Sequence, residues 1–182
     1  MGEREEVLRQ LEARLRGLCV RFWRRNPKRV YVDVPPEHSL AANCILYEEF
    51  RGRLATASGR DTRDRIEVLY HYCLDALNLV VTLRTWGDKP EPEVESVAQL
   101  FPGANFIERE IHDLLGIRFR HHPDPRRLIL ADDWPAGVYP LRRDYPARGG
   151  EAARARLVAL LTGSPQPVAA ALGTAPGAGA RT

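Results

Sequence analysis

The stretch "RIEVLYHYCLDALNLVVTLR", residues 65 to 84, contains two apolar alternations separated by a short break. Apolar side chains recur at every second position, which is the period of a half-buried strand, at Ile66, Val68, Tyr70 and Tyr72 and again at Leu77, Leu79, Val81 and Leu83. Asp75 and Ala76 fit a tight turn between the two runs, although alanine is a poor residue for two-residue hairpin turns. The stretch therefore predicts a β-hairpin with one buried face.

The residues before the hairpin predict two helices and two more strands. Apolar side chains at helical spacing indicate an amphipathic helix over residues 3–18 and a second helix over 37–51. "RVYVDV", residues 29 to 34, alternates as a half-buried strand does and is stopped by two prolines. "RLATASG", residues 53 to 59, is a weak short strand, and "SGRDTRD" is a turn. Together these elements predict an α+β fold of two layers, a mainly antiparallel sheet with helices on one face.

A linker at residues 88–92 precedes a predicted third helix. Asn105 and Glu108 have the spacing of a capping box, and Gly116 suits the left-handed end of a helix. Charged residues flank its apolar stripe, and the pairs Glu108 with His112 and Arg109 with Asp113 are four residues apart. An acid/base role for Glu108, Glu110 and Asp113 is the alternative, but ordinary pairs on a helix flank are the preferred interpretation.

Beyond Phe119 the regular patterns end. Residues 118–148 hold five prolines, seven arginines and four aspartates, so we expect mostly extended chain. Trp134, Tyr139, Tyr145 and an aliphatic triplet at 128–130 argue against disorder. We call residues 118–150 the Pro/Arg arm and expect it to lie on its own domain or on a partner. The predicted domains are thus an α+β domain at 1–117, the arm at 118–150, and a short helix with a disordered low-complexity tail at 151–182.

Composition narrows the classes of function. A chain of 182 residues with 44% hydrophobic content can bury one good core, and its best apolar run is far shorter than a bilayer span. Four glutamates within the first twelve residues argue against a targeting peptide, which predicts a cytoplasmic protein. The three cysteines form no Cys-x-x-Cys pair and predict no disulfide framework or metal site. A net charge of +3 permits an acidic partner without requiring one.

Two kinds of site remain as alternatives. A metal-dependent enzyme could use the His121/His122/Asp124 cluster with Asp132 and Asp133, but the spacing matches no metal motif and solvated or arginine-paired side chains explain it better. A nucleic-acid-binding module could use the basic cluster around Phe22 and Trp23, which comprises Arg21, Arg24, Arg25, Lys28 and Arg29. The end of a surface helix, with arginine side chains lying along it, would contain the same residues. We prefer this interpretation of the basic cluster.

The Pro/Arg arm and the helix before it resemble a known family. "EREIHDLLGIRFRHHPDPRR", residues 108 to 127, followed by "DDWPAGVYPLRRDYP", residues 132 to 146, closely resembles the signature of the 30 kDa-type (C) subunit of respiratory NADH:quinone oxidoreductase (complex I). The related domain of membrane-bound, energy-converting NiFe hydrogenases of the formate hydrogenlyase type carries the same signature. The segment "DDWPAGVYPLR" is similar to the hydrogenase branch, so the parent complex can be either complex I or a NiFe hydrogenase.

The resemblance implies a non-catalytic structural and assembly subunit in the peripheral arm of such a complex. It implies no cofactor in this chain, with iron–sulfur clusters and a flavin or a NiFe centre in partner subunits. It also implies docking on the large subunit, which carries the quinone site or the NiFe centre, beside iron–sulfur subunits. The result is a hetero-oligomer on the cytoplasmic side of the inner membrane, peripheral and membrane-bound only through the complex, with no nucleic acid.

The candidate interface follows from the matching positions. We expect the partner to be contacted by Glu108, Arg109, Glu110, Asp113, His122, Asp124, Arg126, Arg127, Leu128, Leu130, Leu141, Arg142, Arg143 and Asp144. Among them four arginines, at 126, 127, 142 and 143, are predicted charge-pairing anchors, and the helix residues fix the start of the arm. Internal pairing that holds the arm to its own domain is the alternative for each arginine. Arg126→Ala with Arg142→Ala is expected to weaken assembly without unfolding the domain.

Overall fold

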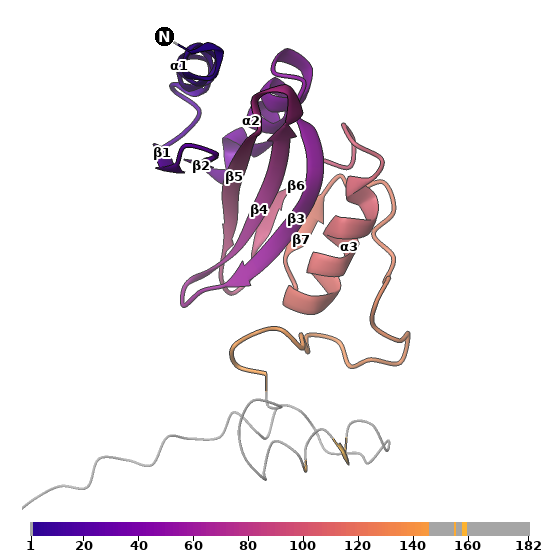
Figure 1. Cartoon of the computed structure of the whole chain (residues 1–182). Helices are drawn as coiled ribbons and strands as arrows, with labels where there is room; N and C mark the ends of the chain where they lie inside the picture. Colours follow the sequence, from indigo (N-terminus) through magenta and orange to yellow (C-terminus); the bar gives the residue numbers. More distant parts are fainter. Residues whose placement is uncertain (1, 146–154, 156–157, 160–182) are drawn as a thin grey trace, which may run out of the picture. The chain divides into compact units, whose positions relative to one another are not determined.

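A five-stranded sheet forms the centre of the computed structural model, which describes residues 2–145, 155, 158 and 159 (Figure 1). Its strand order is β1-β2-β5-β4-β3, from β1 (Arg21–Asn26), β2 (Arg29–Asp33), β3 (Arg53–Asp61), β4 (Arg65–Leu74) and β5 (Leu79–Asp88). β2 and β5 run parallel, and the other neighbours are antiparallel. A small parallel pair joins β6 (Glu93–Glu95) to β7 (Arg118–Arg120). The predicted mainly antiparallel sheet is confirmed.

The helices lie on one face of this sheet, as predicted. They are α1 (Glu3–Leu15), α2 (Ser39–Cys44) and α3 (Ala104–Leu115). Tyr70 and Tyr72 point to the same face of β4. Tyr72 Oη donates a hydrogen bond to Asn43 in α2 at 2.6 Å, and Tyr70 Oη donates one to Glu108 in α3 at 2.9 Å. The fold is therefore α+β with one covered sheet face.

The predicted hairpin is present, with a longer turn than expected. β4 and β5 pair from Arg65 opposite Asp88 to Leu74 opposite Leu79. The connection is a 3-10 turn, η3 (Asp75–Leu77), closed by Asn78 in the left-handed region with φ 47°. Asparagine tolerates that conformation better than most residues. Leu77 therefore lies in the turn, and the second strand begins at Leu79.

Two predictions about short segments were wrong. The basic "RFWRRN" segment is not the end of a helix but the edge strand β1, paired with β2. β3 extends to Asp61, so most of "SGRDTRD" is strand and the turn is confined to residues 62–64. Neither segment alternates cleanly in sequence, and pairing with a strongly patterned neighbour overrides its weak local preference.

The predicted helix over 37–51 forms in three pieces. A 3-10 turn, η1 (Pro36–His38), leads into α2, and a π-helical turn, η2 (Ile45–Glu49), ends it. A Cβ on Gly52 would lie 2.9 Å from the Leu46 carbonyl oxygen, so the chain can leave the helix here only with a glycine. The first helix ends at Leu15 rather than residue 18, and β6 was not expected.

The core lies between the sheet and the helices. It is formed by leucines of α1, the alternating residues of β2, β4 and β5, and apolar residues from Val94 to Phe119. The compact unit runs from Met1 to Arg143, and Asp144–Thr182 form a second unit. Most of the second unit, including nearly all of the helix predicted at 151–162 and the tail, lies outside the described residues. No helix in the described part of the chain is long and apolar enough to cross a membrane.

Candidate functional site

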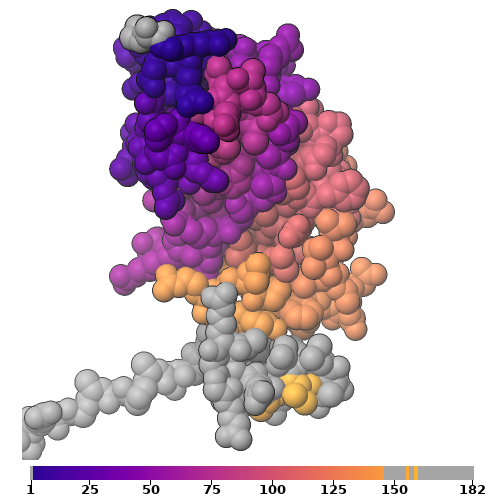
Figure 2. Space-filling view, in the orientation of Figure 1, coloured from indigo at the N-terminus to yellow at the C-terminus, as the bar shows by residue number. Residues whose placement is uncertain are grey.

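The Pro/Arg arm begins with β7 and continues without regular structure as far as it is described, to Tyr145. Figure 2 shows its orange side chains lying against the region of α3. The helix ends at Gly116, whose φ of 69° and N–H bond to His112 O match the predicted left-handed C-terminus. Its N-cap is Gly103 with no side-chain hydrogen bond, so the predicted capping box is wrong. Glu108 points instead into the core.

Arg109 binds the backbone of the arm. Its Nε donates to the Arg126 carbonyl oxygen at 2.7 Å, and its Nη2 donates to the Arg127 carbonyl oxygen at 2.8 Å. Its Nη1 lies 3.1 Å from Asp124 Oδ2. The side chain is buried, so these charge-assisted bonds form away from bulk water. One guanidinium group therefore fixes three points of the arm on α3.

Asp113 fixes the next segment of the arm by accepting hydrogen bonds, whereas Arg109 donates them. Its Oδ2 accepts the backbone N–H groups of Leu128, Ile129 and Leu130 at 2.8, 2.8 and 3.2 Å. Burial raises the pKa of Asp113, but the three N–H bonds more than offset it, so the pKa lies below its ordinary value. The aliphatic triplet predicted to anchor a partner is thus itself anchored, by its backbone, on α3.

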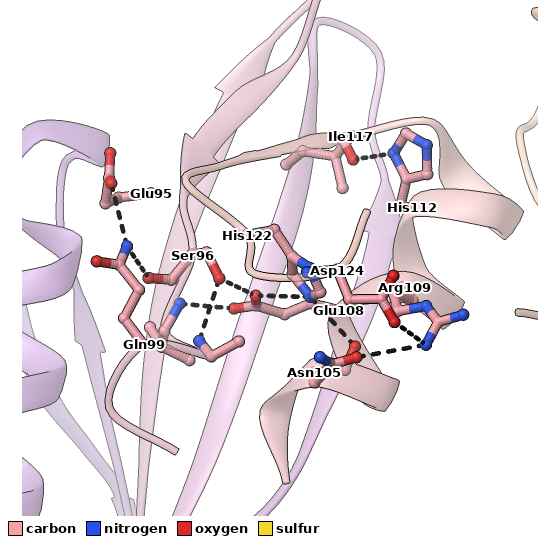
Figure 3. Close-up of polar contacts among 12 residues, drawn as sticks. Glu95, Ser96, Gln99, Asn105, Glu108, Arg109, His112, Ile117, His122 and Asp124 are labelled. Atoms are coloured by element: carbon pink, nitrogen blue, oxygen red, sulfur yellow. Dashed lines mark hydrogen bonds and ion pairs between the residues drawn. The ribbon is translucent and has the colours of Figure 1, made fainter. Parts of the chain in front are cut away.

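Glu108 is fully buried at the centre of a polar cluster (Figure 3). It accepts hydrogen bonds from Tyr70 Oη at 2.9 Å, Ser96 Oγ at 2.5 Å and the Val97 N–H at 2.8 Å. Burial raises the pKa of Glu108 above its ordinary value, although these bonds oppose the shift. The cluster joins β4, α3 and the loop after β6.

His122 seats the beginning of the arm beside this cluster. Its buried ring places Nε2 at 3.2 Å from the Asn105 carbonyl oxygen and 3.7 Å from Glu108 Oε2. The Asp124 N–H points at its Nδ1, 3.1 Å away. Nδ1 is therefore the acceptor and Nε2 carries the proton. Burial lowers the pKa of His122, and Arg109 adds to that effect, so the ring is neutral at pH 7.

Arg142 secures the far end of the arm at the C-terminus of α3. Its Nε donates to the Leu115 carbonyl oxygen at 2.7 Å, and its guanidinium lies 4.5 Å from the Tyr139 ring centre. A cation at this end is favoured by the helix dipole. Tyr139 packs on Gly116, where a Cβ would approach the ring to 2.3 Å. The Leu141 N–H donates to the Leu114 carbonyl oxygen at 3.0 Å.

The other predicted arginines occupy different positions. Arg127 donates to the carbonyl oxygens of Ala131, Asp132 and Trp134 and so shapes its own loop. Arg126 is exposed and pairs with Asp124, whose pKa this bond lowers to about 2. The Arg143 backbone N–H donates to Asp61 at 2.7 Å, and its side chain is exposed. The structure therefore separates two arginines that hold the chain itself, Arg127 and Arg142, from two that face outward.

The remaining candidates are mostly outward-facing. Ile129 is 53% exposed and Leu141 48%, and Leu128 is exposed to a smaller extent. Glu110 and Asp144 are exposed and Leu130 is half-buried. Exposed apolar side chains that gather in one contiguous patch mark binding surfaces.

The structure does not assemble the alternative sites. His121 bonds to Glu95, whereas His122 turns inward, and no group of three potential metal-ligating residues forms among the described residues. The pairs Glu108 with His112 and Arg109 with Asp113 do not form either. His112 Nδ1 lies 2.9 Å from the Ile117 carbonyl oxygen, and the other three side chains bind elsewhere. That prediction of ordinary flank pairs was wrong, because each charged side chain has a tertiary partner.

Several residues that help to hold α3 and the arm in place were not predicted. Asn105 offers its carbonyl oxygen to His122, Ser96 bonds Glu108, and Tyr139 covers Gly116. Only Tyr139 had a sequence signal, since an aromatic residue in an irregular segment needs a surface to cover. Contacts such as Ser96 with Glu108 join loops to the helix and leave no local pattern.

Comparisons with known proteins identify the family of the chain. The profile of the family described as "Respiratory-chain NADH dehydrogenase, 30 Kd subunit" matches residues 32–151. The C subunit of NADH-quinone oxidoreductase from Moorella thermoacetica is 37% identical over 130 residues, covering 66% of this chain and 86% of that protein. The C subunit of F(420)H(2) dehydrogenase from Methanosarcina mazei is 38% identical over 103 residues, covering 56% of this chain and 65% of that protein.

Other relatives match over shorter shares. The fused C/D subunit of NADH-quinone oxidoreductase from Phocaeicola vulgatus is 53% identical over 68 residues, which cover 37% of this chain but 12% of that protein. Against several such relatives the chain spans less than two thirds of their length.

Solved structures share the fold. A chain of the membrane-bound sulfane sulfur reductase, an archaeal respiratory membrane complex, superposes with a TM-score of 0.69 at 21% identity, covering 79% of this chain and 85% of that chain. The trypsin-resistant fragment of Nqo5 superposes with a TM-score of 0.55 at 26% identity, covering 66% of this chain and 97% of that chain. With the profile match over well over half of its length, the chain belongs to the family of the 30 Kd subunit of respiratory-chain NADH dehydrogenase.

Proposed function

We propose that this chain is a structural and assembly subunit of the peripheral arm of a complex I-like oxidoreductase, and that it docks on the large subunit through the Pro/Arg arm. It holds no cofactor itself and supports electron transfer by positioning subunits that carry iron–sulfur clusters and a flavin or a NiFe centre. It reaches the cytoplasmic side of the membrane only through the complex and binds no nucleic acid. Membership of the 30 Kd subunit family and the names of its relatives support this proposal.

The observation that carries the proposal is that one set of side chains attaches the arm to α3 while another set faces outward. Arg109 and Asp113 of α3 bind backbone groups of the arm, and Arg142 of the arm binds carbonyl oxygens at the end of α3. Ile129, Leu141 and Arg126 face outward. The chain thus orders its own binding segment before a partner arrives. An ordered segment loses less conformational entropy on binding, so more of the contact energy contributes to affinity.

Co-purification tests the proposal. The tagged chain is recovered from gently solubilised native membranes, and mass spectrometry identifies what accompanies it. The variant Ile129→Ser with Leu141→Ser removes two outward apolar anchors, so recovery of the large subunit is expected to fall about tenfold. The matched control is Val20→Ser, because Val20 is 67% exposed and lies outside the arm. Recovery of the unmutated chain alone would contradict the proposal.

The composition of the recovered partner identifies the parent complex. A large subunit with four NiFe-binding cysteines would make it a hydrogenase, and one without them would make it a quinone reductase. Arg126→Ala remains a useful companion variant because that side chain is exposed. Arg142→Ala is less suitable, since Arg142 binds carbonyl oxygens of α3 and its loss affects the chain itself.

A further inference from the structure

The sheet has a second face, opposite the helices, that carries charged and aromatic side chains. The strand register places Trp23 opposite Tyr31, and Glu67 opposite both Arg60 and Trp86. We call this surface the outer sheet face. It includes Arg21, Trp23 and Tyr31 at the β1–β2 edge and Arg60, Arg65 and Trp86 on the β3–β4–β5 side.

The negative charges of this face lie below the positive ones. Asp33 and Glu67 are both buried, and a third carboxylate, Asp88, is exposed beside Arg65 at the end of β5. Arg84 binds Asp33 at 2.6 Å, and Arg60 binds Glu67 at 2.6 Å. Arg60 is largely exposed, and Arg65 is more than a third exposed. The two buried carboxylates therefore hold the arginines in place, and guanidinium groups outnumber carboxylates on the solvent side. A surface of this kind attracts negative charge.

The aromatic rings are already covered. Trp23 stacks on Tyr31 with ring centres 4.6 Å apart and planes at 14°. The Arg21 guanidinium lies 5.1 Å from the Trp23 ring centre, and the Arg65 guanidinium lies 4.6 Å from the Trp86 ring centre. Stacking of nucleic-acid bases requires open aromatic faces, and here arginines occupy them. A guanidinium that lies over an indole can still offer N–H groups for bidentate bonds to a carboxylate.

From this arrangement we propose that the outer sheet face is a second docking surface, which binds an acidic protein surface of a neighbouring subunit. It lies on the opposite side of the sheet from α3 and the Pro/Arg arm, so the chain would bridge two partners. Tryptophan, tyrosine and arginine are the residue types that contribute most to protein interfaces. A second copy of this chain docked through the same face would meet it with like charge and is disfavoured.

The partner of the face can be captured directly. Ser58 is exposed and shares this face, since it bonds His71 across β3 and β4 at 2.8 Å. A photo-crosslinking residue at position 58 of the full-length chain, irradiated in native membranes, is expected to link to a peptide rich in aspartate and glutamate from another protein subunit. Links to nucleic acid, to lipid or to a second copy, or no link at all, would overturn the proposal.

Charge variants make the test specific. Arg21→Gln with Arg65→Gln is expected to lower the yield of the crosslink about tenfold. Recovery of the large subunit through the arm is expected to stay unchanged, which keeps this test independent of the proposed function. Arg9→Gln with Arg118→Gln removes the same charge from exposed arginines outside the face. An equal loss of crosslink in this control would contradict the inference.

A conservative variant guards against misfolding of the first one. Arg21→Lys with Arg65→Lys keeps both charges but replaces the planar guanidinium by an ammonium that cannot bind a carboxylate in two places. Its crosslink yield is expected to lie between those of the unmutated chain and the glutamine pair. A yield equal to that of the unmutated chain would show that charge alone suffices and would remove the argument from the arginine–tryptophan stacks.

Discussion

Single buried polar residues decide how α3 is fixed on the sheet, and Glu108 is the clearest case. Its carboxylate is the only acceptor found for Tyr70 Oη and for the Val97 N–H in the described chain. Glu108→Gln keeps an acceptor oxygen and is expected to change the free energy of unfolding at pH 7 by less than about 1 kcal/mol. Glu108→Ala leaves three buried donors, Tyr70 Oη, Ser96 Oγ and the Val97 N–H, without acceptors and is expected to lower that energy by about 3 kcal/mol. Urea unfolding of both variants measures the difference.

The pH dependence of the same residue gives a second test. Burial raises the pKa of Glu108 above its ordinary 4.5, so the folded chain binds this proton more tightly than the unfolded chain does. The stabilising contribution of the protonated group is therefore complete below pH 4.5 and is lost as the pH rises through the folded pKa. Glu108→Gln lacks this effect. Its stability relative to the unmutated chain is expected to increase between pH 4.5 and pH 7, and a constant difference in urea midpoints would contradict the assignment.

The sequence indicated which residues around α3 matter but not which way they point. Arginine and aspartate bind backbone groups of their own chain and side chains of a partner equally well. Arg142 faces α3 and Arg126 faces solvent, although both stand in similar proline-rich surroundings. The partners of Asp113 lie 15 to 17 residues away in sequence, a separation that no helical or strand period marks.

At the scale of elements, the attachment of the arm to α3 rests on Asp113. Asp113→Ala removes the acceptor of the N–H groups at 128–130, so their amide hydrogen exchange is expected to become about tenfold faster or more. Glu110→Ala is the matched control, because Glu110 is exposed on the same helix. Hydrogen-exchange mass spectrometry compares the two variants. Unchanged exchange at 128–130 in Asp113→Ala would mean that Arg109 alone secures the segment.

The C-terminus of α3 offers a second prediction at this scale. Gly116→Ala places a Cβ at a φ of 69° and within 2.3 Å of the Tyr139 ring. We expect a loss of about 2 kcal/mol or more in the free energy of unfolding. Gly103→Ala at the other end of the helix has a φ of −65° and no atom within 4 Å of the new Cβ, so its effect is expected to stay within about 1 kcal/mol. Thermal or urea unfolding distinguishes them, and equal effects would refute the role of the ring.

Elements with a strong period were predictable, and elements that depend on a neighbour were not. β4 and β5 alternate cleanly and were located from sequence, apart from the start of β5. β1, β3 and β6 carry arginines, glycine or too few residues, and they form because a neighbouring strand supplies hydrogen bonds. The helix at 37–51 had the right period, but periodicity does not report the π-helical turn at Ile45–Glu49.

The whole molecule presents two surfaces of different chemistry, and salt is expected to separate them. The Pro/Arg arm offers exposed apolar side chains, whereas the outer sheet face offers guanidinium groups. Raising NaCl from about 0.05 to about 0.5 M shortens the screening length from roughly 14 to roughly 4 Å. Crosslinking at position 58 is expected to fall steeply over this range, while the amount of large subunit recovered by co-purification changes little. Equal sensitivity of both would show that the two surfaces do not act separately.

The way the Pro/Arg arm is tethered has a consequence for how proteins of this family can diverge. Arg109 and Asp113 of α3 bind mainly carbonyl and N–H groups of the arm, which every residue type except proline supplies in full. These hydrogen bonds therefore depend on the path of the arm's backbone and not on the identity of the side chains at the bound positions. Substitutions at the outward positions can accumulate without loosening the arm, so the surface that the arm presents can change while the fold beneath it stays the same.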